Sequence, residues 1–139
     1  MLAADGSEYS ERAVQQVLAI HRELRDPAAM QLHLVNVQRP VSGDVSSFIS
    51  GKSLEEYHQE RSEAALASAR SALDASGLAY RLHHRVGSPG PTIAEVAQAE
   101  KCDLIVMGAR GLGSHTAALL GSVAQATIEH ADVPVLVVK

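Results

Sequence analysis

Short apolar runs alternate along this chain with longer segments whose apolar residues recur every three or four positions. The runs at 104–107 and 133–138 are apolar at almost every position, which is typical of parallel strands covered on both faces. Val14, Val17 and Leu18 instead follow a helical period. The alternation predicts the order β-α-β-α-β-α-β-α-β. Because crossovers between parallel strands are right-handed, we expect an α/β fold, an open five-stranded parallel sheet with helices on both faces.

The chain has 139 residues, which is room for one domain, 1–139. We expect strands at 2–4, 31–37, 80–86, 104–107 and 133–138. We expect helices at about 7–25, 53–76, 92–100 and 122–130. Ser53 and Glu56 have the spacing of a capping box, and Gly77 is placed to end that helix in a left-handed conformation. The third strand is the most polar, so we expect it nearer a sheet edge.

Composition excludes several classes of protein. Aromatic residues make up 3% with no Trp, and the net charge is −4, which argues against a nucleic-acid partner. The single cysteine, Cys102, excludes an internal disulfide and a cysteine-based zinc site. No apolar run approaches the roughly 20 residues of a membrane span, and the first residues lack the basic region of a signal peptide. We therefore expect a cytoplasmic protein with no membrane partner.

Two predicted strand ends carry residues suited to binding an anion. Asp5 follows the first strand, and Gly108 and Gly111 follow the fourth, before Gly121-Ser122 opens the last helix. Ligands of such sheets lie beyond the carboxyl ends of the strands, where the strand order reverses. Glycines let the backbone approach a ligand, and helix N-termini present unpaired amides, so we predict a phosphate cradle. Arg110 adds a nearby positive charge.

The sequence lacks the residues of a rapid catalyst. It contains no P-loop lysine motif, no G-x-S-x-G nucleophile elbow and no H-E-x-x-H zinc motif, and its glycine order differs from the dinucleotide fingerprint. A cradle without a visible base or P-loop lysine suits binding better than fast hydrolysis. We predict no catalytic residues.

The spacing Gly108-x2-Gly111-x9-Gly121-Ser122 matches the motif G-x2-G-x9-G-[ST], and with it the chain resembles the ATP-binding branch of the universal stress protein family. Asp5-Gly-Ser7, Val86-Gly-Ser-Pro89 and the segments 103–108 and 133–138 extend the resemblance over nearly the whole chain. It implies an adenine nucleotide α-hydrolase-like sandwich that binds ATP or AMP, with Mg²⁺ accompanying the nucleotide, and a homodimeric regulator of the stress response or energy state.

The resemblance also assigns residues. It implies that Asp5 contacts the adenosine portion and that backbone at Val37 contacts adenine. It implies that the glycines and the hydroxyl hold ribose and phosphates, namely Gly108, Gly111, Gly121 and Ser122. Arg110, Gly113 and Ser114 lie within the same loop and are carried over with it. One departure is that only Met1–Ala4 precede Asp5, so we expect a shortened central strand.

Each assignment has a structural alternative. The glycines could serve turns and helix packing, Ser122 could be only an N-cap, Asp5 only a turn residue, and Arg110 a solvated side chain. The charged pattern of helix 53–76 is interpreted as a solvated face. Two other functions also stay open: a nucleotide-free dimerisation or interaction module, and a slow ATP hydrolase.

Seven histidines raise the question of a metal site. His33 is interpreted as a hydrogen-bonded core or interface residue, and His115 lies in the cradle loop. His83 and His84 are adjacent on a strand and therefore point to opposite faces, which is poor geometry for one metal ion. We expect no dedicated metal site.

The last strand, Val133–Val138, is apolar on both faces. At a sheet edge, such a strand would invite aggregation unless another chain or element covered it. The family's dimer uses this region, so the resemblance implies a homodimer through Val133–Val138.

Overall fold

The computed structural model describes residues 1–41, 51–113 and 119–139. Its strands are β1 (Leu2–Ala3), β2 (Leu32–Gln38), β3 (Tyr80–Val86), β4 (Ile105–Gly108) and β5 (Val135–Val138). Its helices are α1 (Glu8–Glu23), the short 3-10 helix η1 (Pro27–Ala29), α3 (Gly51–Ser76), α4 (Pro89–Ala99) and α5 (Ser122–His130). The predicted order of elements is confirmed.

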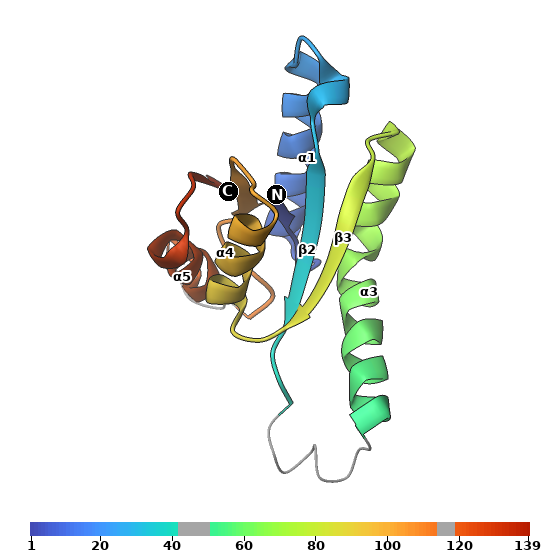
Figure 1. Cartoon of the computed structure of the whole chain (residues 1–139), viewed down its shortest axis with the longest axis vertical. Coiled ribbons are helices and arrows are strands. Elements are labelled where there is room, and N and C mark those ends of the chain that lie inside the picture. The colour runs from blue at the N-terminus through green and yellow to red at the C-terminus, as the bar shows by residue number, and fades with distance from the viewer. Residues whose placement is uncertain (42–50, 114–118) are drawn as a thin grey trace.

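The strands form one parallel sheet in the order β3-β2-β1-β4-β5. β1 pairs with β2 on one side and with β4 on the other, so the strand order reverses between β1 and β4. The central strand is also the shortest, with two residues. Figure 1 shows the long β2 and β3 beside α3. The predicted fold class is confirmed, and the reversal places the ends of β1 and β4 side by side.

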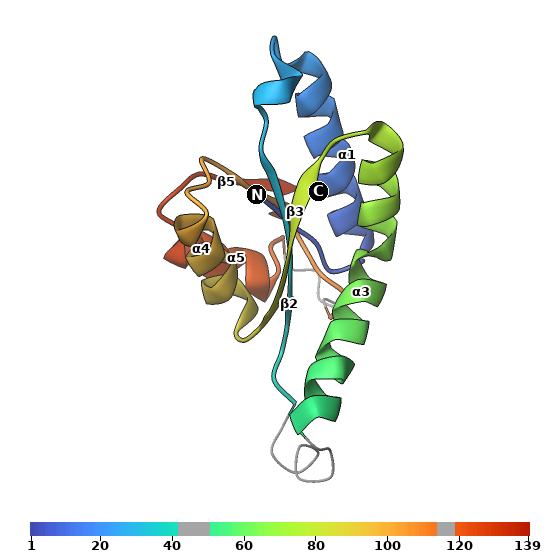
Figure 2. The same cartoon turned by 45° about the vertical axis from the view of Figure 1, so that its right-hand side comes forward.

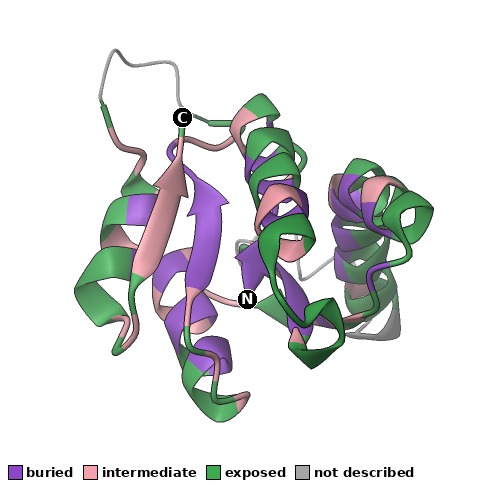
Figure 3. Cartoon of the chain, turned by 90° about the horizontal axis from the view of Figure 1, so that it is seen from above, coloured by how far each residue is buried: buried purple, intermediate pink, exposed green. Residues whose placement is uncertain are grey.

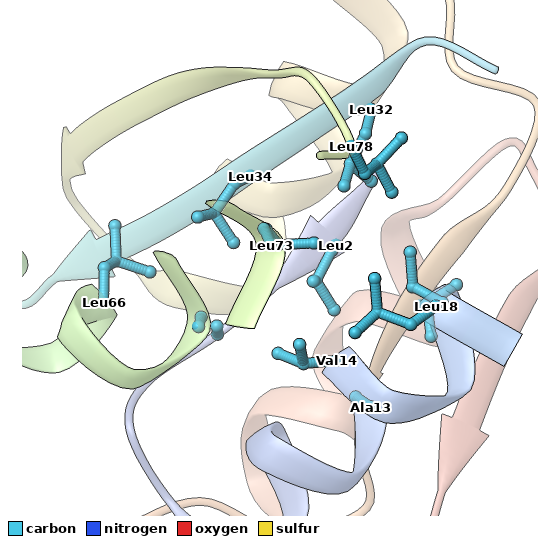
Figure 4. Packing of buried hydrophobic residues seen from close by; sticks show 13 residues of the cluster. Leu2, Ala13, Val14, Leu18, Leu32, Leu34, Leu66, Leu73 and Leu78 are labelled. Carbon is cyan, nitrogen blue, oxygen red and sulfur yellow. The ribbon is translucent and has the colours of Figure 1, made fainter. Parts of the chain in front are cut away.

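Helices cover both faces of the sheet. Seen nearly edge-on in Figure 2, the sheet has α4 and α5 on one side and α1 and α3 on the other. Leu2, Leu34 and Leu73 are fully buried in the core between the sheet and α1 and α3 (Figure 4). Val35 and Ile105 are fully buried in the core under α4 and α5. Because side chains alternate across a strand, β2 supplies Leu34 to one core and Val35 to the other.

The two sheet edges differ in composition. β3 forms one edge and reads Tyr-Arg-Leu-His-His-Arg-Val, which confirms the expectation that this polar strand lies at an edge. β5 forms the other edge, and all four of its residues are half-buried, beside the fully buried β4 (Figure 3). An apolar edge and a polar edge therefore flank the same core.

Two predicted helix starts are wrong. α3 begins at Gly51, so Ser53 lies inside the helix and the capping-box pattern does not mark its first turn. α4 begins at Pro89 rather than at residue 92. Proline suits the first turn of a helix because its missing N–H has no intrahelical partner there, so a segment interpreted as a turn begins the helix. Gly77 has φ +73° and ends α3 as predicted.

None of the helices among the described residues is long and apolar enough to cross a membrane.

Candidate functional site

A cleft of about 1180 Å³ opens where β1 and β4 end. All eight predicted binding residues line it: Asp5, Val37, Gly108, Arg110, Gly111, Gly113, Gly121 and Ser122. A smaller hollow of about 530 Å³ between α1, α3 and the end of β5 contains none of them. Ser114 and His115 lie outside the described residues. The strand-order reversal thus brings the two predicted segments to one cleft.

Asp5 connects the end of β1 to the glycine-rich loop. Its Oδ1 accepts a hydrogen bond from the amide of Ser7 at 3.0 Å, and its Oδ2 accepts one from the amide of Leu112 at 3.2 Å. The hydroxyl of Ser7 donates to the carbonyl of Arg110 at 3.3 Å and also accepts from the amide of Ser10 as the N-cap of α1. The carboxylate therefore fixes the loop's position as well as facing the cleft.

The motif glycines meet different surroundings. A Cβ at Gly108 would lie 2.7 Å from the carbonyl carbon of Tyr9 and 2.9 Å from the amide of Ser10, so α1 approaches the end of β4 only over a glycine. A Cβ at Gly111 would collide with the Asp5 carboxylate. At Gly113 no atom of the described residues lies within 4 Å of such a Cβ. Packing therefore explains Gly108 and Gly111 but, among the described residues, gives no reason for Gly113.

The N-terminus of α5 borders the cleft. Gly121 is the N-cap and Ser122 is the first helical residue, so the alternative interpretation of Ser122 as the N-cap is wrong. The amide of Gly121 donates to the carbonyl of Ala109 at 2.7 Å, which ties the helix start to the loop after β4. The cap supplies no side-chain hydrogen bond. First-turn amides of α5 are therefore available to an anion, together with the positive end of the helix dipole.

Arg110 lies over an aromatic ring. Its guanidinium carbon is 4.7 Å from the centroid of the Tyr9 ring. Its Nε is buried and has no hydrogen-bond partner in the part of the chain that the structure describes. Stacking holds the cation at the wall of the cleft, so the interpretation of Arg110 as a freely solvated side chain is wrong.

Sequence analysis missed three basic side chains that also line the cleft, Arg39, His58 and Arg61. His58 is 8% exposed, and its buried Nδ1 has no hydrogen-bond partner within 1–41, 51–113 and 119–139. Arg61 donates to the hydroxyl of Tyr57 at 3.0 Å. His58 and Arg61 are three residues apart on α3 and so share one face of the helix. The three-residue spacing of His58 and Arg61 was the signal available in the sequence. It could not be told apart from the charged pattern of helix 53–76, which the sequence analysis interpreted as a solvated face.

The backbone of Val37 extends past the end of β1. The carbonyl of Val35 accepts from the amide of Ala4 at 3.0 Å, and the carbonyl of Gln38 accepts from the amide of Gly87 at 2.9 Å on the β3 side. Backbone polar groups alternate in direction along a strand, so those of Val37 point to the same side as those of Val35. Beyond Ala4, the chain turns away at Asp5, and the Val37 groups face the cleft.

A second polar cluster lies apart from the cleft. His33 on β2 and His83 on β3 are both buried, and His33 Nδ1 lies 2.9 Å from His83 Nε2. Glu100 caps the end of α4, and its Oε2 lies 3.7 Å from His33 Nδ1. Burial lowers the pKa of His33 and the pKa of His83, while the Glu100 carboxylate opposes that shift. The structure confirms the expectation that His33 is a hydrogen-bonded core residue.

Known proteins are similar to this chain over its whole length. The sequence profile of the Universal stress protein family matches residues 1–139. Universal stress protein MJ0531 of Methanocaldococcus jannaschii is 32% identical over 145 residues, which cover 100% of this chain and 80% of that protein.

Solved structures show the same architecture. The structure of the protein MJ0577 from Methanocaldococcus jannaschii has a TM-score of 0.82 at 28% identity and covers 99% of this chain and 92% of that chain. A universal stress protein solved in complex with cAMP has a TM-score of 0.71 at 25% identity, with 99% and 94% covered. The likeness extends over both the core and the segments that border the cleft.

Proposed function

Because the chain belongs to the universal stress protein family, we propose that it binds an adenine nucleotide, ATP or AMP, in the cleft at the ends of β1 and β4. The distribution of charge carries the proposal. The chain has a net charge of −4, yet the described charged residues that line the cleft are Arg39, Arg61, Arg110 and only one carboxylate, Asp5. A basic cleft in an acidic protein attracts an anionic ligand.

The geometry supports a position for each end of the nucleotide. The phosphates would lie at Ser122 and the first-turn amides of α5, and the Arg110 guanidinium, which lines the same cleft, would supply positive charge. The adenosine portion would lie between Asp5 and the backbone groups of Val37 that face the cleft, because an N–H and a carbonyl side by side match the edge of adenine. The similar protein solved with cAMP supports a nucleotide in this fold.

Binding suits the site better than turnover. The Asp5 carboxylate already accepts two backbone hydrogen bonds, so it is poorly placed to act as a base. We propose that nucleotide occupancy reports the energy state in the cytoplasm, where Mg²⁺ would accompany ATP. Bound nucleotide would stabilise the contacts that connect Asp5 with Leu112 and with the start of α5.

Isothermal titration calorimetry with ATP, AMP, cAMP and GTP tests the proposal. We expect saturable binding of at least one adenine nucleotide, weakened about tenfold by Arg110→Gln and by Arg61→Gln, since each loses a charge-assisted contact. Arg81→Gln, an exposed arginine on β3 outside the cleft, is the matched control and should bind normally. Absence of heat with every nucleotide would leave the interaction module as the function.

We also propose that β5 pairs with a second copy of the chain. Its four residues are apolar and half-buried at an open sheet edge, which a partner strand would cover. Size-exclusion chromatography with light scattering should show twice the 14.7 kDa of one chain. Val137→Lys should shift the protein toward monomer, while Arg85→Lys on the polar edge should not. A wild-type mass of one chain at micromolar concentration would contradict the dimer.

A further inference from the structure

We propose that His33, His83 and Glu100 form a binding site for one divalent transition-metal ion, with Zn²⁺ as the best-matched ion. None of the three residues lines the nucleotide cleft, so the site is separate from the proposed function. Within the described part of the chain, they form the single group of three histidine, cysteine or acidic residues whose donor atoms converge, all within 4.8 Å of one another.

The sheet register creates the cluster. His83 lies opposite Val35, so His33, two residues earlier on β2, is its diagonal neighbour on the same face. The two rings stack with centroids 5.2 Å apart and planes 21° apart. His84 points to the other face, where it contacts the hydroxyl of Ser62 at 2.6 Å. His83 and His84 therefore cannot share a metal ion, as the sequence analysis predicts. His33 lies on the same face as His83 and supplies the second imidazole instead.

The donor set has the chemistry of a known zinc arrangement. Two imidazoles and one carboxylate hold zinc in sites that keep the fourth position for water or substrate. Bonds of about 2.0–2.1 Å at tetrahedral angles separate the donor atoms by about 3.3 Å. The His33–His83 separation of 2.9 Å must widen slightly, and the His33–Glu100 separation of 3.7 Å must narrow. The donor atoms of His83 and Glu100, which lie within 4.8 Å of each other, must also approach this spacing.

Neighbouring charges determine how strongly the His33–His83–Glu100 cluster attracts a cation. The Glu100 carboxylate favours a cation, while the amino group of Met1 and the guanidinium groups of Arg81 and Arg85 oppose one. Both arginines are exposed, so water and salt screen their repulsion. The Met1 amino group donates a hydrogen bond to the carbonyl oxygen of Leu104 at 2.7 Å, which fixes the position of its positive charge.

Cobalt titration of the full chain, stripped of metal with EDTA and free of nucleotide, tests the proposal. We expect one equivalent of Co²⁺ to produce the visible absorption of a four-coordinate site, Zn²⁺ to displace it, and Zn²⁺ to raise the melting temperature. His33→Gln and His83→Gln should each weaken binding by at least about 100-fold, and Glu100→Gln by about tenfold or more.

His84→Gln is the matched control, because it removes an imidazole from the same strand but the opposite face. It should retain the full cobalt spectrum. Glu100 is only half-buried, so Glu100→Gln keeps the test informative if an imidazole variant fails to fold. Lack of one-equivalent binding by the wild type would overturn the proposal. So would binding that persists unchanged in folded His33→Gln, His83→Gln or Glu100→Gln.

Discussion

The cleft at the ends of β1 and β4 and the His33–His83–Glu100 cluster are built in different ways. The cleft is formed largely by backbone and turns at strand ends, where Gly111 and Gly121 lie within one continuous segment. The cluster is formed by side chains from β2, β3 and the end of α4, which lie far apart in the sequence. The residues of a continuous segment have a fixed spacing that can be recognised in the sequence. Residues that strand register brings together have no such spacing. The first kind of site is visible in a sequence and the second is hidden.

The largest expected effect is the difference in the free energy of unfolding between a variant of the closely packed Gly108 and a variant of Gly113. Gly108→Val would drive a side chain into the backbone of Tyr9 and Ser10, and we expect it to lower the free energy of unfolding by about 3 kcal/mol. Gly113→Ala meets no described residue within 4 Å and should change the free energy of unfolding by less than about 0.5 kcal/mol. Urea unfolding measures both. Equal losses would mean that the cleft's backbone is not constrained as described.

Nucleotide should stabilise the protein through the cleft alone. At a concentration of 100 Kd we expect about 2.7 kcal/mol of added stability, seen as a rise in melting temperature. The double variant His33→Gln/His83→Gln should show the same rise relative to its own baseline, whereas Arg110→Gln should need more nucleotide to reach it. A smaller rise in the histidine variant would show that the two sites are coupled.

Removing the Asp5 carboxylate should loosen the loop without a large change in packing. Asp5→Ala leaves the amides of Ser7 and Leu112 without their acceptor, and we expect a loss of about 1 kcal/mol in the free energy of unfolding, because the Leu112 hydrogen bond is exposed to water. Asp5→Asn keeps one acceptor oxygen and should lose less. Glu95→Ala, an exposed carboxylate on α4, is the control and should cost little. Hydrogen exchange of the Leu112 amide should accelerate in Asp5→Ala, and unchanged exchange would contradict the contact.

The smallest expected effect is a pH dependence of the histidine cluster. Burial lowers the pKa of His33 and of His83 below the ordinary value of 6.5, so the unfolded chain binds more protons than the folded one as the pH falls. The resulting penalty is absent above pH 6.5 and grows below it, so stability should decrease toward acid.

Urea unfolding in EDTA from pH 8 to pH 5, roughly the range in which histidine titrates, would measure this decrease. His33→Gln/His83→Gln should flatten the profile, and His84→Gln should leave its slope as in the wild type. A double variant with the wild-type slope would assign the pH dependence to other groups.

The sequence analysis identified most of the cleft because its residues follow strand ends. Asp5 and the glycine-rich segment had to meet once β1 and β4 became neighbours, and the family resemblance supplied their roles as a hypothesis. His58 and Arg61 were missed because a helical pair of basic residues looks the same whether it faces water or a cleft. The helix starts at Gly51 and Pro89 were missed because local capping rules tolerate more than one first residue.

By itself the sequence determined the order of the elements and the fold class, and it predicted a glycine-rich segment at the cleft, because hydrophobic period and glycine spacing are local properties of the chain. Only the tertiary structure decided that Gly108 is needed by α1, that Arg110 stacks on Tyr9, and that His33 meets His83 rather than water. Those outcomes depend on strand register and on which helix face turns inward, and both are settled by packing between segments distant along the chain.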